Sequence, residues 1–234
     1  IVRSGNIQDS AKLTQALQEF SNEYSLSHVR AILPEEKAYL FTAVIDRVPG
    51  EGLRDAVAFI LEENVPVPLA ESVFYFDVIA ENSESLKLKV VVSVLPKKIA
   101  TDYLSVFSQA GMLPVAFDIE SQAIARAIVP NGDKTTQLII NLEGKKTGFY
   151  VVEDEVVQFS TTLPYSVSSG AHLGDLKTEI QKIFGFWGSR QKKIEKALLC
   201  GPASTHQGWV DQLMSQCPVS HTFSNPWVNL ATGI

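Results

Sequence analysis

Apolar residues recur along the N-terminal part of the chain first at helical and then at strand spacing. After Asp9, which can cap a helix, apolar residues every three or four positions predict an amphipathic helix over residues 8–24. Two short β-rich runs follow at residues 28–33 and 38–45, and Pro34 separates them. This pattern predicts a helix and then two adjacent strands.

The following segment has the pattern of a small mixed unit. One apolar face predicts a helix over residues 53–63. Two long runs, residues 72–80 and 86–95, flank the polar turn 81–85 and alternate as in a half-exposed hairpin. Residues 35–96 are therefore expected to form a compact α+β unit.

The rest of the chain alternates predicted helices and strands. The predicted elements are a helix at 97–110, a strand at 115–119, a helix at 120–128, strands at 137–142, 147–152 and 156–162, a helix at 175–195, a strand at 197–200 and a helix at 206–215. Tight polar turns join the three consecutive strands. They are expected to form an antiparallel meander.

Composition excludes several functional classes. The net charge of −6, from 26 acidic and 20 basic residues, gives no basic face for nucleic acid. Four scattered histidines offer no metal-ligand spacing, and the two cysteines lack C-x-x-C spacing, so buried free thiols in a reducing compartment are expected. No run approaches the roughly 18 apolar residues that span a bilayer. Any membrane contact is expected to come through a partner.

Four local strings carry a family resemblance. They are LPEEK at residues 33–37, EENVPVPL at 62–69, AGMLPVAFDIE at 110–120 with Ala123 and Arg126 after it, and SNPW at 224–227. Together they resemble the PilM family of type IV pilus assembly proteins, over residues 5–230.

The resemblance implies an α/β, actin-like (RNase H-like) two-part fold with a small inserted α+β subdomain. Residues 1–34 and 97–130 would form the first actin-like subdomain, residues 35–96 the inserted subdomain, and residues 131–234 the second actin-like subdomain. The first phosphate-holding hairpin and the final helix of the family are absent from this sequence, and residues 166–175 stand where the family has an entire outer subdomain. Truncation of a longer gene product is the simplest expectation for the two ends.

The resemblance also implies a nucleotide site, which this sequence retains only in part. Its positions correspond to Glu120, Asn141, Gly144, Lys145, Thr147 and Gly201. A phosphate loop needs glycines so that backbone N–H groups can approach the anion, and a carboxylate that holds the water of a metal ion. Here the family's aspartate is replaced by Asn141, and Pro202 removes a backbone donor beside Gly201.

The charged residues of the turn at 141–147 also argue against a functional phosphate site. Glu143 adds a negative charge where phosphate would lie unless its side chain turns away, and either Lys145 or Lys146 is a candidate to compensate it. We therefore expect weak or lost ATPase activity and no cofactor, with ATP and Mg²⁺ possible in a longer gene product.

Relatives in the PilM family hold the N-terminal tail of the inner-membrane protein PilN in a groove beside the inserted subdomain. The resemblance thus implies a cytoplasmic scaffold of a pilus assembly complex, peripheral to the inner membrane and not inserted in it. Apolar candidates for the groove are Phe41, Phe59, Val65, Phe74 and Phe76. The same residue types in strands and helices are also those that build a core.

Two other functions remain open at this stage. One is an ATP-binding, actin-like enzyme or filament former. The other is the cytoplasmic domain of a type II secretion scaffold of the GspL kind, which the short connection at 166–175 favours.

Overall fold

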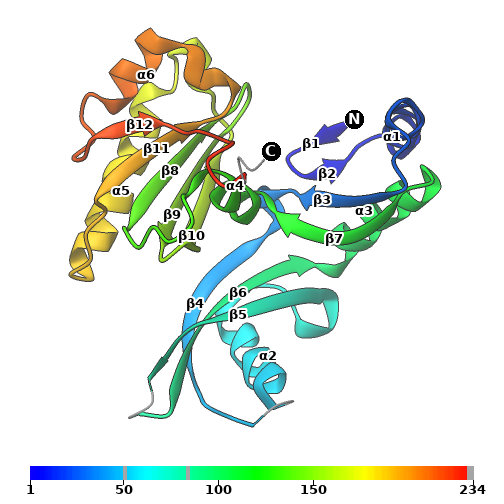
Figure 1. The fold of residues 1–234 in the computed structure, drawn as a ribbon, viewed down its shortest axis with the longest axis horizontal. Helices are drawn as coiled ribbons and strands as arrows, with labels where there is room; N and C mark the ends of the chain where they lie inside the picture. Colours follow the sequence, from blue (N-terminus) through cyan, green and yellow to red (C-terminus); the bar gives the residue numbers. More distant parts are fainter. Residues whose placement is uncertain (50–51, 83–84, 231–234) are drawn as a thin grey trace. The chain divides into compact units, whose positions relative to one another are not determined.

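The computed structural model describes residues 1–49, 52–82 and 85–230, and the chain divides into two compact units, Ile1–Glu120 and Ser121–Ile234. Figure 1 shows the first unit in blue to green and the second in green to red. No helix among the described residues has the length and apolar composition that a membrane span requires.

The first unit contains an α/β part and the inserted subdomain. Its elements are β1 (Val2–Arg3), β2 (Asn6–Ile7), α1 (Ser10–Tyr24), β3 (His28–Leu33), β4 (Tyr39–Asp46), α2 (Gly52–Asn64), β5 (Ser72–Asn82), β6 (Lys87–Pro96), α3 (Lys97–Gln109) and β7 (Leu113–Ile119). The Asp9 carboxylate caps α1 by accepting a hydrogen bond from the backbone N–H of Lys12 at 3.0 Å, as the sequence predicted. The amphipathic pattern buries less than expected, because no residue of α1 is fully buried and Phe20 is 50% exposed.

Strands β3 and β4 are not neighbours, which corrects the sequence prediction. Strand β3 pairs in parallel with β7, whereas β4 pairs antiparallel with β6. Pro34 and the short 3₁₀ segment Glu35–Lys37 lie between the two strands and direct the chain from one sheet into the other. A periodicity of two indicates a strand but does not name its partner.

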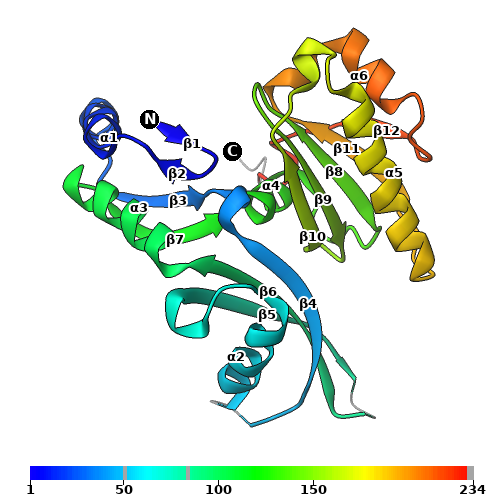
Figure 2. The same cartoon turned by 180° about the vertical axis from the view of Figure 1, so that it is seen from behind.

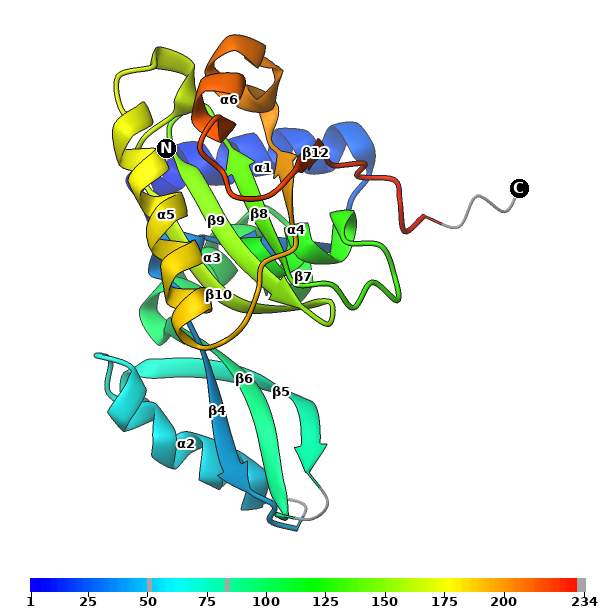
Figure 3. The ribbon, with the colours of Figure 1, turned by 90° about the vertical axis from the view of Figure 1, so that its left-hand side faces the viewer.

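The inserted subdomain is a three-stranded antiparallel sheet with the order β4-β6-β5, covered on one face by α2. Figure 3 shows α2 lying along this sheet. The buried residues between helix and sheet are Ile45, Val57, Leu61, Val65, Leu88, Val90, Val92 and Val94. The alternation read from the sequence thus gives this subdomain its core.

The second unit is a mixed five-stranded sheet with helices packed on it. Its elements are α4 (Glu120–Ile128, which begins at the last residue of the first unit), β8 (Gln137–Leu142), β9 (Thr147–Glu153), β10 (Val156–Leu163), α5 (Leu173–Ser189), β11 (Lys196–Cys200), α6 (Gln207–Met214) and β12 (His221–Phe223). The strand order is β10-β9-β8-β11-β12, with β11 parallel to both of its neighbours. The predicted meander is confirmed as β8, β9 and β10.

Helices α5 and α6 cover one face of this sheet, as the view in Figure 2 shows. Leu138, Ile140 and Leu142 of β8 point into this core together with Leu176 and Ile180 of α5. All six residues of β8 are buried, so its other face is covered as well. A strand buried on both faces is read as a continuous apolar run, which is why the sequence located it well.

Helix α4 is held at its C-terminal end by Asn229. The Asn229 side-chain amide donates to the carbonyl oxygens of Arg126 (2.9 Å) and Val129 (2.6 Å), and its oxygen accepts from the N–H of Asn131 (2.9 Å). These bonds satisfy carbonyl groups that a helix end leaves without partners. The two units accordingly divide at Glu120 and Ser121, whereas the sequence suggested a boundary near residue 130.

An ion pair closes the end of the sheet where β8 and β11 begin. Asp133 accepts hydrogen bonds from the N–H and hydroxyl of Thr135, at 3.0 and 2.6 Å, and from the Lys196 ammonium at 2.5 Å. Burial alone would raise the pKa of Asp133, but the hydrogen bonds from Lys196 and Thr135 outweigh it and lower the pKa to about 2.

This lowered pKa predicts an acid-dependent contribution to stability. The contribution is present above the ordinary carboxyl pKa of 3.8 and is lost as the pH falls through about 2. We expect Asp133→Asn to lower the free energy of unfolding by roughly 1–2 kcal/mol at pH 5, after allowance for screening by solvent, and by almost nothing at pH 2. Urea unfolding from pH 2 to 7 measures the difference. Asp154→Asn, at a more exposed ion pair with Lys134, is the control, and a difference independent of pH would contradict the prediction.

Candidate functional site

The carboxyl ends of the parallel strands β8 and β11 bring two of the predicted nucleotide loops together. Ligands of open α/β sheets bind at such ends. Cys200 at the end of β11 is paired with Asn141, and its thiol lies 3.6 Å from the Asn141 Oδ1 atom. Gly201 follows with a φ of +86°, and a Cβ there would lie 2.5 Å from the Leu142 carbonyl oxygen. Glycine is therefore required where these loops meet.

In the turn between β8 and β9, the Glu143 carboxylate is paired with neighbouring side chains of the same turn. The Asn141 side-chain amide donates to Glu143 Oε1 at 3.1 Å, and the Lys146 ammonium lies 3.9 Å from the same oxygen. The Lys146 side chain is only 18% exposed, whereas Lys145 is exposed. Of the two lysines that the sequence offered, Lys146 is the one beside Glu143. The carboxylate at this turn is thus engaged by the chain itself.

The short segment that follows β10 is bonded to the same turn. The Ser166 hydroxyl donates to the Glu143 carbonyl at 2.8 Å, and the buried Thr147 hydroxyl donates to the Tyr165 carbonyl at 2.8 Å. The Thr147 hydroxyl therefore has a partner within the protein. Gly144 remains exposed, with no atom within 4 Å of its Cβ position.

Asn141, Gly144, Lys145, Thr147 and Gly201 thus share one end of the second unit, while Glu120 is the last residue of the first unit. Glu120 lies in the first turn of α4, where a carboxylate suits the helix dipole. Among the residues that the structure describes, no group of three or more His, Cys, Asp and Glu side chains is arranged to hold a metal ion.

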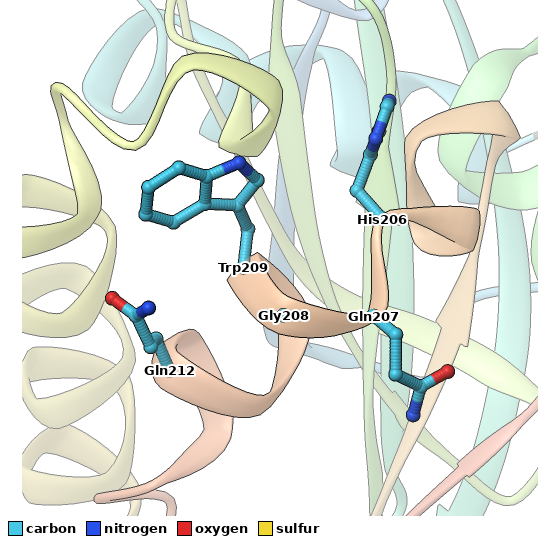
Figure 4. A pocket seen from close by; sticks show the side chains of 5 residues that line it. All are labelled: His206, Gln207, Gly208, Trp209 and Gln212. Atoms are coloured by element: carbon cyan, nitrogen blue, oxygen red, sulfur yellow. The ribbon is translucent and has the colours of Figure 1, made fainter.

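A shallow pocket lies at the start of α6 and is drawn in Figure 4. Its lining residues are His206, Gln207, Gly208, Trp209 and Gln212. The Trp209 ring closes it on one side and would lie 2.6 Å from a Cβ at Gly170, which has a φ of +67°. Gly170 is therefore required by the tight approach of the indole. No carboxylate or lysine lines this pocket.

The predicted partner-binding residues of the inserted subdomain differ in how far they are buried. Val65 is buried against the sheet, and Phe41, Phe74 and Phe76 pack on the same core. Val65 is therefore a core residue, whereas Phe41, Phe74 and Phe76 are only partly buried, because alternate strand residues on the α2 side fill the space beneath the helix. Phe59 is the most exposed of the five, at 75%.

On the opposite face of this sheet, Val91, Ser93 and Leu95 of the central strand β6 are buried. The exposed apolar side chains of this face, which the sequence did not single out, come from the outer strands β4 and β5. Val44 is 65% exposed, Tyr75 is 64% exposed and Val73 is 39% exposed. The Tyr75 hydroxyl donates to Asp77 at 3.0 Å, and this bond to the carboxylate raises the pKa of Tyr75. These residues stand at the strand positions between the core residues, so the alternation itself was the available signal.

Both outer strands of this sheet, β4 and β5, pair only with β6 among the described strands. Each therefore presents one edge of backbone N–H and C=O groups, which an added strand can pair with. We name the surface formed by Val44, Val73 and Tyr75, with these edges, the open sheet face. It combines apolar contact with backbone hydrogen-bonding capacity.

Two α/β halves, one of them interrupted by an α+β subdomain, define the class of the molecule: it has the actin-like fold. No protein-family model and no curated protein sequence matches the chain. The similarity lies in solved structures, at sequence identities that establish the fold alone.

A chain of the PilM-PilN type IV pilus biogenesis complex is 18% identical, with a TM-score of 0.80 over 97% of this chain and 78% of that chain. The ethanolamine utilization protein EutJ from Carboxydothermus hydrogenoformans is 12% identical, with a TM-score of 0.55 over 95% of this chain and 72% of that one. The cytoplasmic domain of EpsL, an inner membrane component of the type II secretion system of Vibrio cholerae, is 12% identical, with a TM-score of 0.53 over 81% of this chain and 68% of that one. The resemblance read from the local strings is confirmed at the level of the fold.

Proposed function

We propose that the chain is a cytoplasmic scaffold of a type IV pilus assembly machine that binds the N-terminal tail of a PilN-like inner-membrane protein. The observation that carries this proposal is the likeness to a chain of the PilM-PilN complex, at a TM-score of 0.80 over 97% of this chain. The scaffold would lie at the inner membrane through this partner, as one part of the pilus assembly complex.

The open sheet face is the surface that we assign to the tail. An extended peptide gains affinity from backbone hydrogen bonds to a free strand edge and specificity from side-chain contacts. Tyr75 and Val44 provide exposed apolar surface beside such edges. The candidates Phe41, Phe74 and Phe76 support this face from beneath by holding the sheet against α2.

Loss of nucleotide turnover is the second part of the proposal. Phosphate would meet a turn whose carboxylate, Glu143, is already bonded to Asn141 and lies near Lys146. The Thr147 hydroxyl is engaged by Tyr165. A site that holds Mg-ATP needs unengaged donors and a carboxylate for the metal's water shell. These features favour a scaffold without a cofactor over an ATPase.

A binding assay with a fluorescein-labelled PilN-like N-terminal tail tests the partner. We expect saturable binding, and a Kd about tenfold higher for the double variant Val44→Thr and Tyr75→Ser, because it removes most of the apolar contact of the open sheet face. Tyr24→Ser changes a tyrosine of similar exposure, 56%, on α1 of the same unit and should leave the Kd within about twofold. Absence of saturable binding by the unchanged protein would exclude the proposal.

The two alternatives each have one supporting observation and one test. Nucleotide binding draws support from the meeting of Asn141 and Gly201 at the carboxyl ends of parallel strands. Isothermal titration with Mg-ATP tests nucleotide binding, and a Kd well below millimolar would favour this alternative.

A type II secretion scaffold draws support from the EpsL domain, which matches 81% of this chain. Preference for a tail from a secretion-system partner over the PilN-like tail would favour that function.

A further inference from the structure

Helix α2 carries an exposed stripe that its packing does not use. Asp55, Phe59, Glu62 and Glu63 are exposed and lie at intervals of three or four residues, so they share the face turned away from the sheet. We name this set the α2 stripe. Its centre is Phe59, at 75% exposure the most exposed large apolar side chain of the described residues. An aromatic ring is thus flanked by carboxylates on both sides.

The position of two of these carboxylates is unfavourable for the helix itself. Glu62 and Glu63 lie in the last turn of α2, which contains no basic residue. The C-terminal end of a helix carries a partial negative charge, so anions there destabilise it and cations stabilise it. Arg54, a cation of the same helix, lies instead over the Phe74 ring, 4.3 Å from its centre. The last turn of α2 therefore lacks the positive charge that its dipole favours.

The whole inserted subdomain shares this excess of negative charge. Residues 35–96 contain 11 of the 26 acidic and 5 of the 20 basic residues, a net charge of −6, so the remaining residues, with 15 of each sign, are neutral overall. The entire net charge of the protein thus resides in this one subdomain. An electrostatic field of this sign attracts and orients cationic partners.

We propose that the α2 stripe is a docking surface for a Lys/Arg-rich segment of a protein partner. A cationic side chain would lie over the face of Phe59, where cation–π attraction acts, between the carboxylates of Asp55 and Glu62. Its neighbours would pair with Glu63 and supply the positive charge absent from the last turn of α2. The inference rests on the proposed function for its partner, because cytoplasmic flanks of inner-membrane proteins are enriched in Lys and Arg.

The test uses the full chain and a fluorescein-labelled octapeptide of alternating Lys and Ser, with a Glu-Ser octapeptide as the counterpart. We expect saturable binding of the Lys peptide at 20 mM NaCl, weakened at 300 mM, and none of the Glu peptide. The triple variant Asp55→Asn, Glu62→Gln, Glu63→Gln should bind about tenfold more weakly, and Phe59→Leu, which keeps an apolar side chain without a π face, about threefold more weakly.

The matched control neutralises three exposed carboxylates outside the inserted subdomain, in Glu19→Gln, Glu23→Gln and Asp211→Asn. It changes the net charge equally and should alter the Kd by less than about twofold. Equal weakening in both triple variants would overturn the proposal in favour of a bulk charge effect. Lack of saturable binding of the Lys peptide would overturn it directly.

Thermal unfolding distinguishes a docking role of the α2 stripe from a structural one. The two roles predict opposite shifts of the unfolding midpoint when the carboxylates are removed. Removal of Glu62 and Glu63 charges from the end of α2 should raise the midpoint of the inserted subdomain by about 2 °C while binding weakens. A lowered midpoint would mean that the carboxylates stabilise the fold, and would contradict the docking role. The PilN-like tail separates the two proposals: if the tail fails to bind while the Lys peptide binds at the stripe, the proposed pilus function falls and the docking surface stands.

Discussion

Gly201→Ala is expected to lower the free energy of unfolding of the second unit by roughly 3–4 kcal/mol. An alanine at a φ of +86° costs about 1–2 kcal/mol in backbone strain. Its Cβ would also lie 2.5 Å from the Leu142 carbonyl oxygen and 2.6 Å from Asn141 Oδ1, so the ends of β8 and β11 must separate. Tryptophan fluorescence during urea unfolding measures the loss, because Trp187, Trp209 and Trp227 all belong to this unit.

Gly132→Ala separates strain from overlap. Gly132 lies in the same unit with a similar φ of +84°, but no atom is within 4 Å of its Cβ position. Only the strain remains there, so we expect a loss of about 1 kcal/mol. Equal losses in the two variants would show that the Leu142 carbonyl after β8 does not crowd the Cβ position of Gly201 after β11.

Leu61→Ala is expected to destabilise the inserted subdomain by roughly 2–5 kcal/mol. Leu61 is 1% exposed and lies in the core between α2 and the sheet, so the substitution leaves a cavity in addition to the lost burial. Calorimetry and far-UV circular dichroism measure the change, because the first unit contains no tryptophan. The open sheet face should lose its order in parallel, with weaker binding of the PilN-like tail.

Phe59→Ala, two positions away on the same helix, is the contrasting variant. Its side chain is 75% exposed, so its removal should change stability by less than about 0.5 kcal/mol. A loss comparable with that of Leu61→Ala would mean that Phe59 belongs to the core, and would remove the basis of the α2 stripe.

The candidate nucleotide site was predictable in its composition but not in its bonding. The replacement of an aspartate by Asn141 and the presence of Pro202 are visible in the sequence. That the Asn141 amide bonds Glu143, and that Thr147 is held by Tyr165, follows from side-chain directions across a folded turn. Spacing along the chain does not specify those directions.

For the partner-binding surface, the sequence predicted the strands but not which of their faces would be covered. The alternation over residues 72–80 and 86–95 correctly indicated two strands, and β5 has the expected buried and exposed faces, whereas Val90–Leu95 of β6 are buried on both faces. It did not tell which face α2 would cover, so Phe41, Phe74 and Phe76 were selected while Val44 and Tyr75 were passed over. Large aromatic residues are the best core formers, and a choice by residue type favours the buried face.

The actin-like fold, with residues 35–96 as an inserted subdomain, was implied by the family resemblance of four local strings. From its own pattern the sequence determined most of the helices and strands, the meander of β8 to β10 and a compact α+β unit at residues 35–96. These depend on periodicities and turns that act within about 15 residues. Tertiary structure alone decided that β3 pairs with β7, that α4 groups with the second unit, and which aromatic residues pack beneath α2. Strand partners and covered faces are set by contacts between segments distant in sequence, and a local pattern fits more than one of them.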